Sequence, residues 1–376
     1  MQSVLRRLAQ LDWVLILSIV PIVIAGLVTM YSFTGSEVYF SRQIIWVCVS
    51  VVVLALTALF DYSVFTRTGV IVGLYVGICA ALLLVASVGS VAKGAQSWFN
   101  FGAFSVQPSD PAKIVLILML AKYFSRRHIA ISNIRHILVS GAYTLIIFGL
   151  VLLQPDFGSA VIIFAIWLGM VLVSGISKKH LFVLGLIGVV VGGALWTYGF
   201  EQYQRDRIMT FLHPLADIRG AGYNAYQSTI AVGSGEVLGK GIGFGTQSRL
   251  QFLPEFETDF IFAAFSEEWG FIGSLIILLL YGVILWRLVM LGMRGARNFE
   301  TLYAVGLAIL ILTHVTINIG MNIGLLPVTG VVLPFMSYGG SHLVTEAAAI
   351  GLAMSMRRRA LATHRGLIQN EFIGPQ

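Results

Sequence analysis

The sequence predicts an all-α polytopic membrane protein with about ten transmembrane helices. Of its 376 residues, 57% are hydrophobic and 11% are charged, and the mean hydropathy is +0.89. Soluble domains carry about 25% charged residues, so the chain lies outside their range. Apolar stretches of about 17 to 25 residues, the length that crosses a bilayer, recur along the chain. We therefore expect a single transmembrane domain over residues 1–376.

Each apolar segment is expected to form one membrane-spanning helix. The fourth segment is short, and we expect Val106–Asp110 to extend it. Between the seventh and eighth helices lies a long connection, residues 200–258, and loops of this length are usually functional or disordered. Because it holds aromatic residues and glycines, we expect ordered structure over the outer membrane face. The predicted spans are residues 12–31, 44–60, 69–88, 111–124, 137–153, 157–174, 181–199, 260–286, 302–325 and 335–355.

The distribution of Lys and Arg predicts the orientation. With ten spans and an inner N-terminus, most of the 24 basic residues fall in inner connections and in the tail. Lys and Arg are enriched in cytoplasmic loops, so we expect both termini in the cytoplasm, with residues 356–376 as a basic cytoplasmic tail. Topology and attraction to anionic lipid explain the net charge of +7. This charge does not indicate a nucleic-acid partner.

The stretch VQPSDPAKI begins the fourth helix with a carboxylate and an ammonium group. Pro111 suits the first helical position, which makes Asp110 the expected N-cap. Lys113 then falls in the first turn, where the helix dipole disfavours a cation. We expect an anionic partner for Lys113, either Asp110 or a bound anion. The alternative is that Lys113 extends to the membrane interface without a functional role.

Three other polar groups each have a simpler structural explanation beside a functional one. Gln154–Asp156 form a tight turn that needs no function to explain it. His314, Asn318 and Asn322 lie at i, i+4 and i+8, a stripe that favours interhelical hydrogen bonding over the lining of a cavity. Ser337–His342 contain paired glycines and hydroxyls, which suit an anionic head group or only break a helix.

The stretch LPEFETDFIFAAF raises the strongest functional hypothesis. It places Glu255, Glu257 and Asp259 within five residues at the outer edge of the eighth helix. Thr258 or Asp259 could be a plain helix cap. Three neighbouring carboxylates near lipid, however, raise the pKa of at least one of them. A carboxylate placed in this way can accept a proton from a hydroxyl group.

Several familiar catalytic patterns are absent from the sequence. The glycine-rich stretch VGSGEVLGKGIGFG is no phosphate-binding loop, because Gly241 follows Lys240 where Ser or Thr is required. His and Cys show no metal-ligand spacing, and no nucleophile elbow occurs. The sequence therefore predicts no covalent catalytic machinery.

Five separated motifs resemble the SEDS family. They occur in the family's order, cover nearly the whole chain, and are more similar to the elongation (RodA-type) branch than to the division branch. The motifs are KGAQSWFNFGAFSVQPSDPAKI, QPDFGSA, GTQSRLQFLPEFETDFIFAAFSEEWGFIG, NIGMNIGLLPVTGVVLPFMSYGGS and the terminal MRRR.

This resemblance implies a peptidoglycan glycosyltransferase in the bacterial inner membrane that polymerises lipid II at the outer face. The family's essential aspartate matches Asp259, the expected catalytic base. The substrate-binding residues that we expect are Lys113, Asp110, Asp156, Arg249, Trp98 and Ser337. The implied partners are lipid II, a class B penicillin-binding protein transpeptidase and elongation proteins of MreC and MreD type. The resemblance implies no certain cofactor, and it leaves open whether a divalent cation is required.

Three residues depart from the family pattern. Asp110 stands where Glu is usual, and His342 where Ser is common. Ser97 stands before Trp98 where the family often has Arg. Loss of that cation leaves Arg249 or Lys240 to contact a pyrophosphate.

A glycosyltransferase is not the only function that intramembrane polar residues allow. A lipid II flippase or other transporter also lines its path with polar groups, although inverted repeats are not evident here. A scaffold that recruits wall enzymes is a third hypothesis. The candidate residues gather at the outer edge rather than at mid-depth, which favours an enzyme that faces outward.

Overall fold

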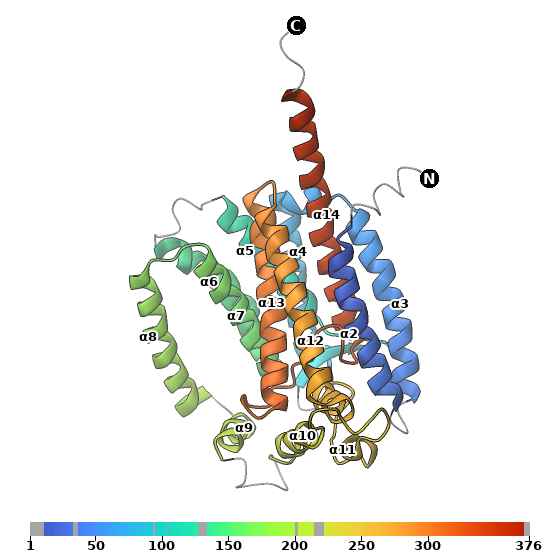
Figure 1. The fold of residues 1–376 in the computed structure, drawn as a ribbon. Coiled ribbons are helices and arrows are strands. Elements are labelled where there is room, and N and C mark those ends of the chain that lie inside the picture. Colours follow the sequence, from blue (N-terminus) through green and yellow to red (C-terminus); the bar gives the residue numbers. More distant parts are fainter. Residues whose placement is uncertain are drawn as a thin grey trace.

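The structure, a computed structural model, describes residues 11–32, 37–92, 95–102, 104–126, 134–199, 202–213 and 222–371. Ten long helices form one bundle, and three shorter helices lie across one of its ends (Figure 1). The long helices are α2 (Trp13–Ser32), α3 (Glu37–Leu59), α4 (Thr68–Val88), α5 (Ser109–Ser125), α6 (Ile134–Leu152), α7 (Phe157–Val173), α8 (Lys178–Ala194), α12 (Ile261–Met293), α13 (Asn298–Asn322) and α14 (Gly340–Glu371).

The ten predicted spans each correspond to one of these helices. Within the described residues, seven helices are long and apolar enough to cross a membrane. Of the other three, α5 and α7 have 17 residues each, and α14 carries charged residues in its second half. The polytopic helical fold class is therefore confirmed.

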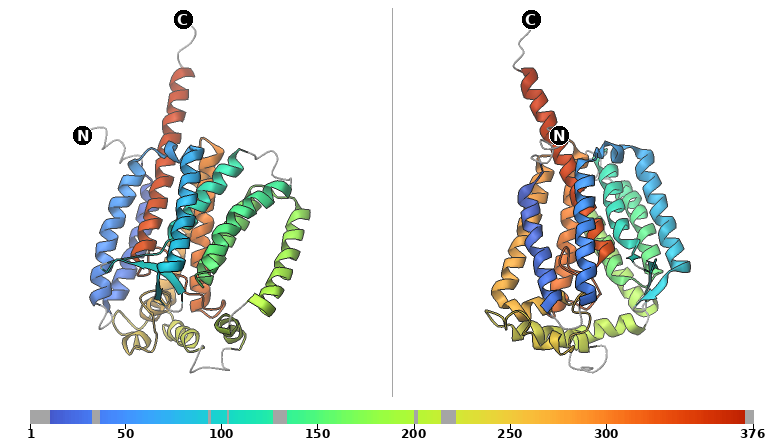
Figure 2. Two further views of the ribbon diagram at one scale, coloured as in Figure 1. Left: turned by 180° about the vertical axis from the view of Figure 1, so that it is seen from behind. Right: turned by 90° about the vertical axis from the view of Figure 1, so that its right-hand side faces the viewer.

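Helix α13 lies at the centre of the bundle and α8 at its edge. Of the most apolar window of α13, 67% is buried, and this helix packs on α12, α5 and α7. None of the α8 window is buried (Figure 2). His314, Asn318 and Asn322 of α13 are buried within the protein.

Helix α14 runs well beyond the predicted end of the tenth span at residue 355. Its second half projects out of the bundle (Figure 1). Two of its arginines form ion pairs with neighbouring segments: Arg357 pairs with Asp12, directly before α2, at 3.1 Å, and Arg359 pairs with Asp61, after α3, at 2.9 Å. We call this end of the bundle the tail end. Arg6, Arg7 and residues 372–376 lie outside the described residues.

The opposite end, which we call the site end, carries the segment between α8 and α12. It contains α9 (Gln202–Leu212), α10 (Tyr223–Ser234) and α11 (Thr246–Arg249). Residues 200, 201 and 214–221 of the predicted loop lie outside the described residues. Helices α5, α7, α12 and α14 all begin at the site end, so their N-termini converge there (Figure 2).

A small antiparallel sheet joins α4 to α5, which the all-helical prediction did not include. Its strands are β1 (Ser90–Ala92), β2 (Ala95–Asn100) and β3 (Ser105–Val106). Val106 therefore belongs to a strand, and the predicted extension of the fourth span begins only at Ser109.

Glycines let helices and connections approach closely in the core. A Cβ atom added at Gly351 of α14 would lie 2.0 Å from Thr57 Oγ1 and 2.6 Å from the Leu54 carbonyl oxygen of α3. The backbone cannot yield to such a contact without separating the two helices. By contrast, Gly73 in α4 has no heavy atom within 4 Å of an added Cβ.

We predict that Gly351→Ala destabilises the protein by about 1–3 kcal/mol, because it forces α3 away from α14. Gly73→Ala is the matched control, since both changes give a helix the same gain in intrinsic propensity. The measurement is the thermal unfolding midpoint of each purified variant in one detergent. Equal midpoints for the two variants would contradict the close packing of α3 and α14.

Candidate functional site

Asp259 lies in the turn directly before α12, at the site end. The helix begins at Ile261, and the N-cap residue is Phe260, with no hydrogen bond from its side chain. The plain-cap interpretation of Thr258 or Asp259 is therefore wrong. Instead, Asn322 Oδ1 accepts a hydrogen bond of 3.1 Å from the Ala263 N–H, so the cap comes from α13. The Asp259 side chain is partly exposed.

Two buried asparagines hold the backbone of Asp259. Asn318 Nδ2 donates to the Asp259 carbonyl oxygen at 2.9 Å, and Asn322 Nδ2 donates to the same oxygen at 3.1 Å. Both asparagines are fully buried, and Asn318 also donates to the Val331 carbonyl oxygen. The polar stripe on α13 therefore makes interhelical hydrogen bonds, as the sequence favoured. Its bonds converge on the candidate base.

The connection between α13 and α14 passes close to the Asp259 carboxylate. Gly330 has a φ of +73°, and a Cβ added there would lie 3.6 Å from Asp259 Oδ2. A residue other than glycine would be strained at this φ. The glycine thus lets the chain turn beside the carboxylate.

Ser337 fastens this connection to the turn that carries Asp259. Its Oγ donates to the Thr258 carbonyl oxygen at 2.7 Å and accepts from the Leu333 N–H at 2.8 Å. The Tyr338 N–H donates to the Glu257 carbonyl oxygen at 2.8 Å. Because the Ser337 hydroxyl both donates and accepts within the protein, its observed contacts are structural.

Asp110 and Lys113 form a buried pair in the first turns of α5. The helix begins at Ser109 after Pro108, so Asp110 lies inside the helix, and its prediction as the N-cap is wrong. Lys113 Nζ lies 3.2 Å from Asp110 Oδ1, and each residue is 4% exposed. Asp110 is therefore the anionic partner that the sequence predicted for Lys113. The ammonium group is not at the surface.

His342 joins this pair to α14. Its Nδ1 lies 3.3 Å from Asp110 Oδ1, and its Nε2 lies 2.9 Å from Glu346 Oε1. The ring stacks on His314 with centroids 4.9 Å apart. Two of the three departures from the family pattern, Asp110 and His342, are thus in direct contact. Sequence analysis did not single out Glu346, although its spacing of four residues from His342 places both on one helix face.

Asp156 connects the beginnings of α5 and α7. It is the N-cap of α7, and its Oδ1 accepts from the Ser159 N–H at 3.0 Å. Its Oδ2 accepts from Gln107 Nε2 at 2.9 Å, a partner that sequence analysis missed. One residue into α7, a Cβ added at Gly158 would lie 2.7 Å from the Thr329 carbonyl oxygen. Asp156 and Asp259 therefore border the same connection, residues 323–339.

The remaining predicted residues are placed differently. Lys240 is no free cation: its Nζ donates to Glu267 Oε1 at 2.7 Å and to Thr246 Oγ1 at 2.9 Å. Arg249 ends α11 and is exposed. Trp98 lies on β2 and is partly buried, and no hydrogen bond joins its indole to another described residue. Asp156 and Asp259 thus border one connection, which Ser337 joins to the turn before Asp259, and His342 links the Asp110–Lys113 pair to α14. No described hydrogen bond or ion pair joins the side chains of Arg249 or Trp98 to these residues.

The described residues contain no group of three or more His, Cys, Asp and Glu side chains that could hold a metal ion. The site end carries the partly exposed carboxylate of Asp259, whose backbone is held by hydrogen bonds, and the start of α5 carries the buried Asp110–Lys113 ion pair.

Comparison with known proteins identifies the family. A model of FtsW, RodA and SpoVE proteins, described as a cell cycle protein, matches residues 6–361. The chain belongs to this family. It is 36% identical over 363 residues to the peptidoglycan glycosyltransferase MrdB of Escherichia coli, a match that covers 95% of both chains. To the stage V sporulation protein E of Bacillus subtilis it is 36% identical over 331 residues, or 87% of this chain and 89% of the relative.

Solved structures of the family share the fold. One, described as "Structural coordination of polymerization and crosslinking by a peptidoglycan synthase complex", gives a TM-score of 0.80 at 31% identity. It covers 93% of this chain and 98% of the other. The crystal structure of the Thermus thermophilus rod shape determining protein RodA gives a TM-score of 0.70 at 30% identity, with 93% and 97% covered. The resemblance to the SEDS family found in the motifs is confirmed.

We predict that Asp110 and His342 are energetically coupled. Asp110→Glu crowds the imidazole, and His342→Ser removes a partner of a buried carboxylate, so each single change should cost about 1–3 kcal/mol. The double variant should cost at least about 1 kcal/mol less than the sum, because the longer carboxylate fills the space that the ring leaves. The measurement is the free energy of unfolding of all four proteins. Additive effects would show that the two residues act independently.

Proposed function

We propose that this chain is a peptidoglycan glycosyltransferase that polymerises lipid II, with Asp259 as the catalytic base. The observation that carries the proposal is the fixed position of Asp259. Its carbonyl is held by two buried asparagines, and its carboxylate lies beside Gly330 at the site end. MrdB of Escherichia coli, named as a peptidoglycan glycosyltransferase, matches 95% of the chain.

The chemistry is an inverting single displacement. The 4-hydroxyl of one lipid-linked disaccharide attacks the anomeric carbon of another sugar. The bond from that carbon to undecaprenyl pyrophosphate breaks, and the pyrophosphate leaves with its electron pair. Asp259 takes the proton of the attacking hydroxyl. No carboxylate nucleophile is required, in contrast to retaining glycosidases.

Positive charge near the leaving group would stabilise the transition state. The Asp110–Lys113 pair lies at the start of α5, and we assign it to this electrostatic role rather than to a surface contact, because both side chains are buried. Asp156 orders the start of α7 beside the same connection. Arg249 is exposed on α11, and we propose that it contacts the substrate from outside. For Trp98 and Ser337 we retain a role in shaping the substrate site.

The site end faces outward in this proposal. The basic residues that the sequence assigns to the inner side, such as Arg126, Arg287 and Arg294, lie at the tail end, in accord with the excess of Lys and Arg in cytoplasmic segments. Both substrates carry lipid tails, so a site at the membrane edge allows their sugars to meet. We propose that the chain assembles with a transpeptidase of the penicillin-binding class and with elongation proteins of MreC and MreD type.

The transporter alternative is not favoured. The MrdB relative, which matches 95% of the chain, is named as a peptidoglycan glycosyltransferase, and so, as probable, is the FtsW relative of Haemophilus influenzae, which matches 73%. The candidate residues lie at the site end, whereas a translocation path needs polar groups at mid-depth and towards the inner face.

We predict that Asp259→Asn lowers the rate of lipid II polymerisation by about 10²–10⁴-fold, because the amide cannot accept the hydroxyl proton. The measurement is glycan strand formation by purified protein in liposomes, with the cognate transpeptidase added in one series. Glu255→Gln, which neutralises a carboxylate in the same turn, is the control and should stay within a few-fold of wild type.

Near wild-type strand formation by Asp259→Asn would remove Asp259 as the base. An equal loss in Asp259→Asn and Glu255→Gln would point to the fold of the turn rather than to proton transfer.

A further inference from the structure

The His342 ring lies between two buried carboxylates. Its Nδ1 is 3.3 Å from Asp110 Oδ1, and its Nε2 is 2.9 Å from Glu346 Oε1. The first contact has the geometry of a hydrogen bond, whereas the second lies off the N–H direction and is an electrostatic contact. Asp110 and Glu346 are each 4% exposed, so both carboxylates depend on the protein to compensate their charge.

This arrangement requires a proton on both ring nitrogens of His342. A neutral imidazole has one N–H donor and one nitrogen that carries a lone pair. In a neutral His342, that lone pair would lie within 3.3 Å of a carboxylate oxygen on one side of the ring or the other. Only the imidazolium presents positive N–H groups towards both carboxylates.

The charges of this buried group balance when His342 is an imidazolium. Asp110 and Glu346 each carry a negative charge, and Lys113, whose Nζ lies 3.2 Å from Asp110 Oδ1, carries a positive charge. With a neutral His342, one negative charge would stay uncompensated away from water, which is costly. The imidazolium supplies the missing positive charge.

The elements that pack around His342 bring no further charge to it. His314 of α13 stacks on the ring, and its Nδ1 donates to the Val332 carbonyl oxygen at 3.2 Å, because a carbonyl can only accept. Its Nε2 is buried without a partner among the described residues, which fits a neutral ring. Tyr281 of α12 donates its hydroxyl to the Pro334 carbonyl oxygen. Among the described residues of α3 and β3, which also pack on α14, none forms an ion pair with the His342 ring.

Glu346 links this group to the connection between α13 and α14. Its Oε2 accepts a hydrogen bond of 3.1 Å from the Phe335 N–H. Phe335 has a φ of +62°, a strained conformation for a bulky residue, and such strain persists only where the surroundings enforce it. Phe335 lies two residues before Ser337, whose hydroxyl holds the turn that carries Asp259.

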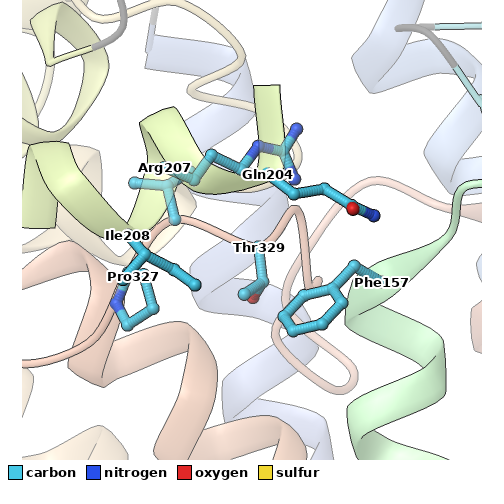
Figure 3. Close-up of a pocket in the computed structure, with 7 residues that line it drawn as sticks. Phe157, Gln204, Arg207, Ile208, Pro327 and Thr329 are labelled. Atoms are coloured by element: carbon cyan, nitrogen blue, oxygen red, sulfur yellow. The ribbon is translucent and has the colours of Figure 1, made fainter. Parts of the chain in front are cut away.

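The other end of this connection lies against α7. Pro327 and Thr329 border a small pocket together with Phe157 of α7 (Figure 3). The Thr329 carbonyl oxygen would lie 2.7 Å from a Cβ added at Gly158. Glu346 therefore holds the connection from the α14 side, while the start of α7 borders it on the other.

We propose that His342 is a positioning residue, held as an imidazolium, that bridges Asp110 and Glu346. Through Asp110 it orients the ammonium group of Lys113. Through Glu346 it fixes the strained turn at Phe335. The role in catalysis rests on the proposed function, whereas the charge of the ring does not depend on it.

The first test is ¹⁵N nuclear magnetic resonance of histidine-labelled full-length protein in lipid nanodiscs. The spectrum is recorded at about pH 8, where a free imidazole is mostly neutral. We expect two protonated ring nitrogens for His342 and one for His314. The signals are assigned by their loss in His342→Gln and His314→Gln. A neutral His342 ring would overturn the proposal.

The second test is rescue by charge balance. His342→Gln leaves one buried negative charge uncompensated, so we expect a lower thermal unfolding midpoint. We also expect kcat for lipid II to fall by about tenfold or more with little change in KM, because His342 touches no substrate. Adding Glu346→Gln removes the negative charge, and glutamine can still accept from the Phe335 N–H. The double variant should regain the midpoint and a kcat within about threefold of wild type.

Two further variants make this test specific. Glu346→Gln alone should lower the midpoint and kcat, because it leaves the imidazolium with an uncompensated positive charge. His136→Gln is the matched control, since His136 is a buried imidazole that lies 2.9 Å from the Tyr123 hydroxyl rather than beside a carboxylate. Combined with Glu346→Gln, it should give additive losses without rescue.

Losses that add in the His342→Gln, Glu346→Gln double variant would show that the ring carries no charge and would contradict the proposal. Should His342→Gln fail to fold, the double variant decides: recovered folding supports the charge balance, and continued failure contradicts it. Unchanged kcat in His342→Gln would remove the positioning role. A rescued midpoint in a protein whose wild type makes no glycan strands would remove the proposed function and leave the imidazolium in place.

Discussion

The site end depends on two hydrogen bonds that meet at one carbonyl oxygen. Asn318 and Asn322 lie one turn apart on α13, and their amide groups both donate to the Asp259 carbonyl. A buried amide that is shielded from water must find its partners within the protein. This arrangement therefore satisfies both asparagines and also fixes the turn that carries Asp259. Asn322 also caps α12 through the Ala263 N–H. The start of α12 and the position of the candidate base are thus set by a neighbouring helix.

The surrounding groups extend that constraint in two directions. Towards α14, Ser337 and the Tyr338 N–H bind the 257–258 backbone. Towards α7, the Thr329 carbonyl lies against Gly158, next to Asp156. A side chain at Gly158 would separate these segments, and one at Gly330 would be strained by its positive φ. Hydrogen bonds from Asn318, Asn322 and Ser337 therefore hold the backbone around Asp259, which suits a base that must keep its geometry during a reaction.

Much of the fold could be predicted from the sequence, because lipid restricts what a spanning segment can be. Long apolar stretches located all ten helices, and their ends agree best where a loop follows directly. The N-cap prediction for Asp110 failed because α5 starts two residues before Pro111. Proline is tolerated anywhere in the first turn, where N–H groups have no partner within the helix.

The contacts that build the site could not be predicted, because they join residues far apart in the chain. Nothing local shows that Asn322 replaces a cap at residue 259, or that Lys240 pairs with Glu267. That ion pair depends on the break of α12 at Gly270, where φ is +66° and the glycine-rich 235–243 segment packs against the helix backbone. The glycines that resembled a phosphate-binding loop in composition serve this packing.

The central claim, that the α13 amides hold Asp259 in place for catalysis, is tested most directly by the polymerisation kinetics of Asn318→Leu. Leucine has a similar volume but leaves the Asp259 carbonyl with one donor fewer. The account predicts a fall in kcat of about tenfold or more with little change in KM for lipid II, in protein that remains folded and monodisperse. Wild-type kcat in folded Asn318→Leu protein would contradict it.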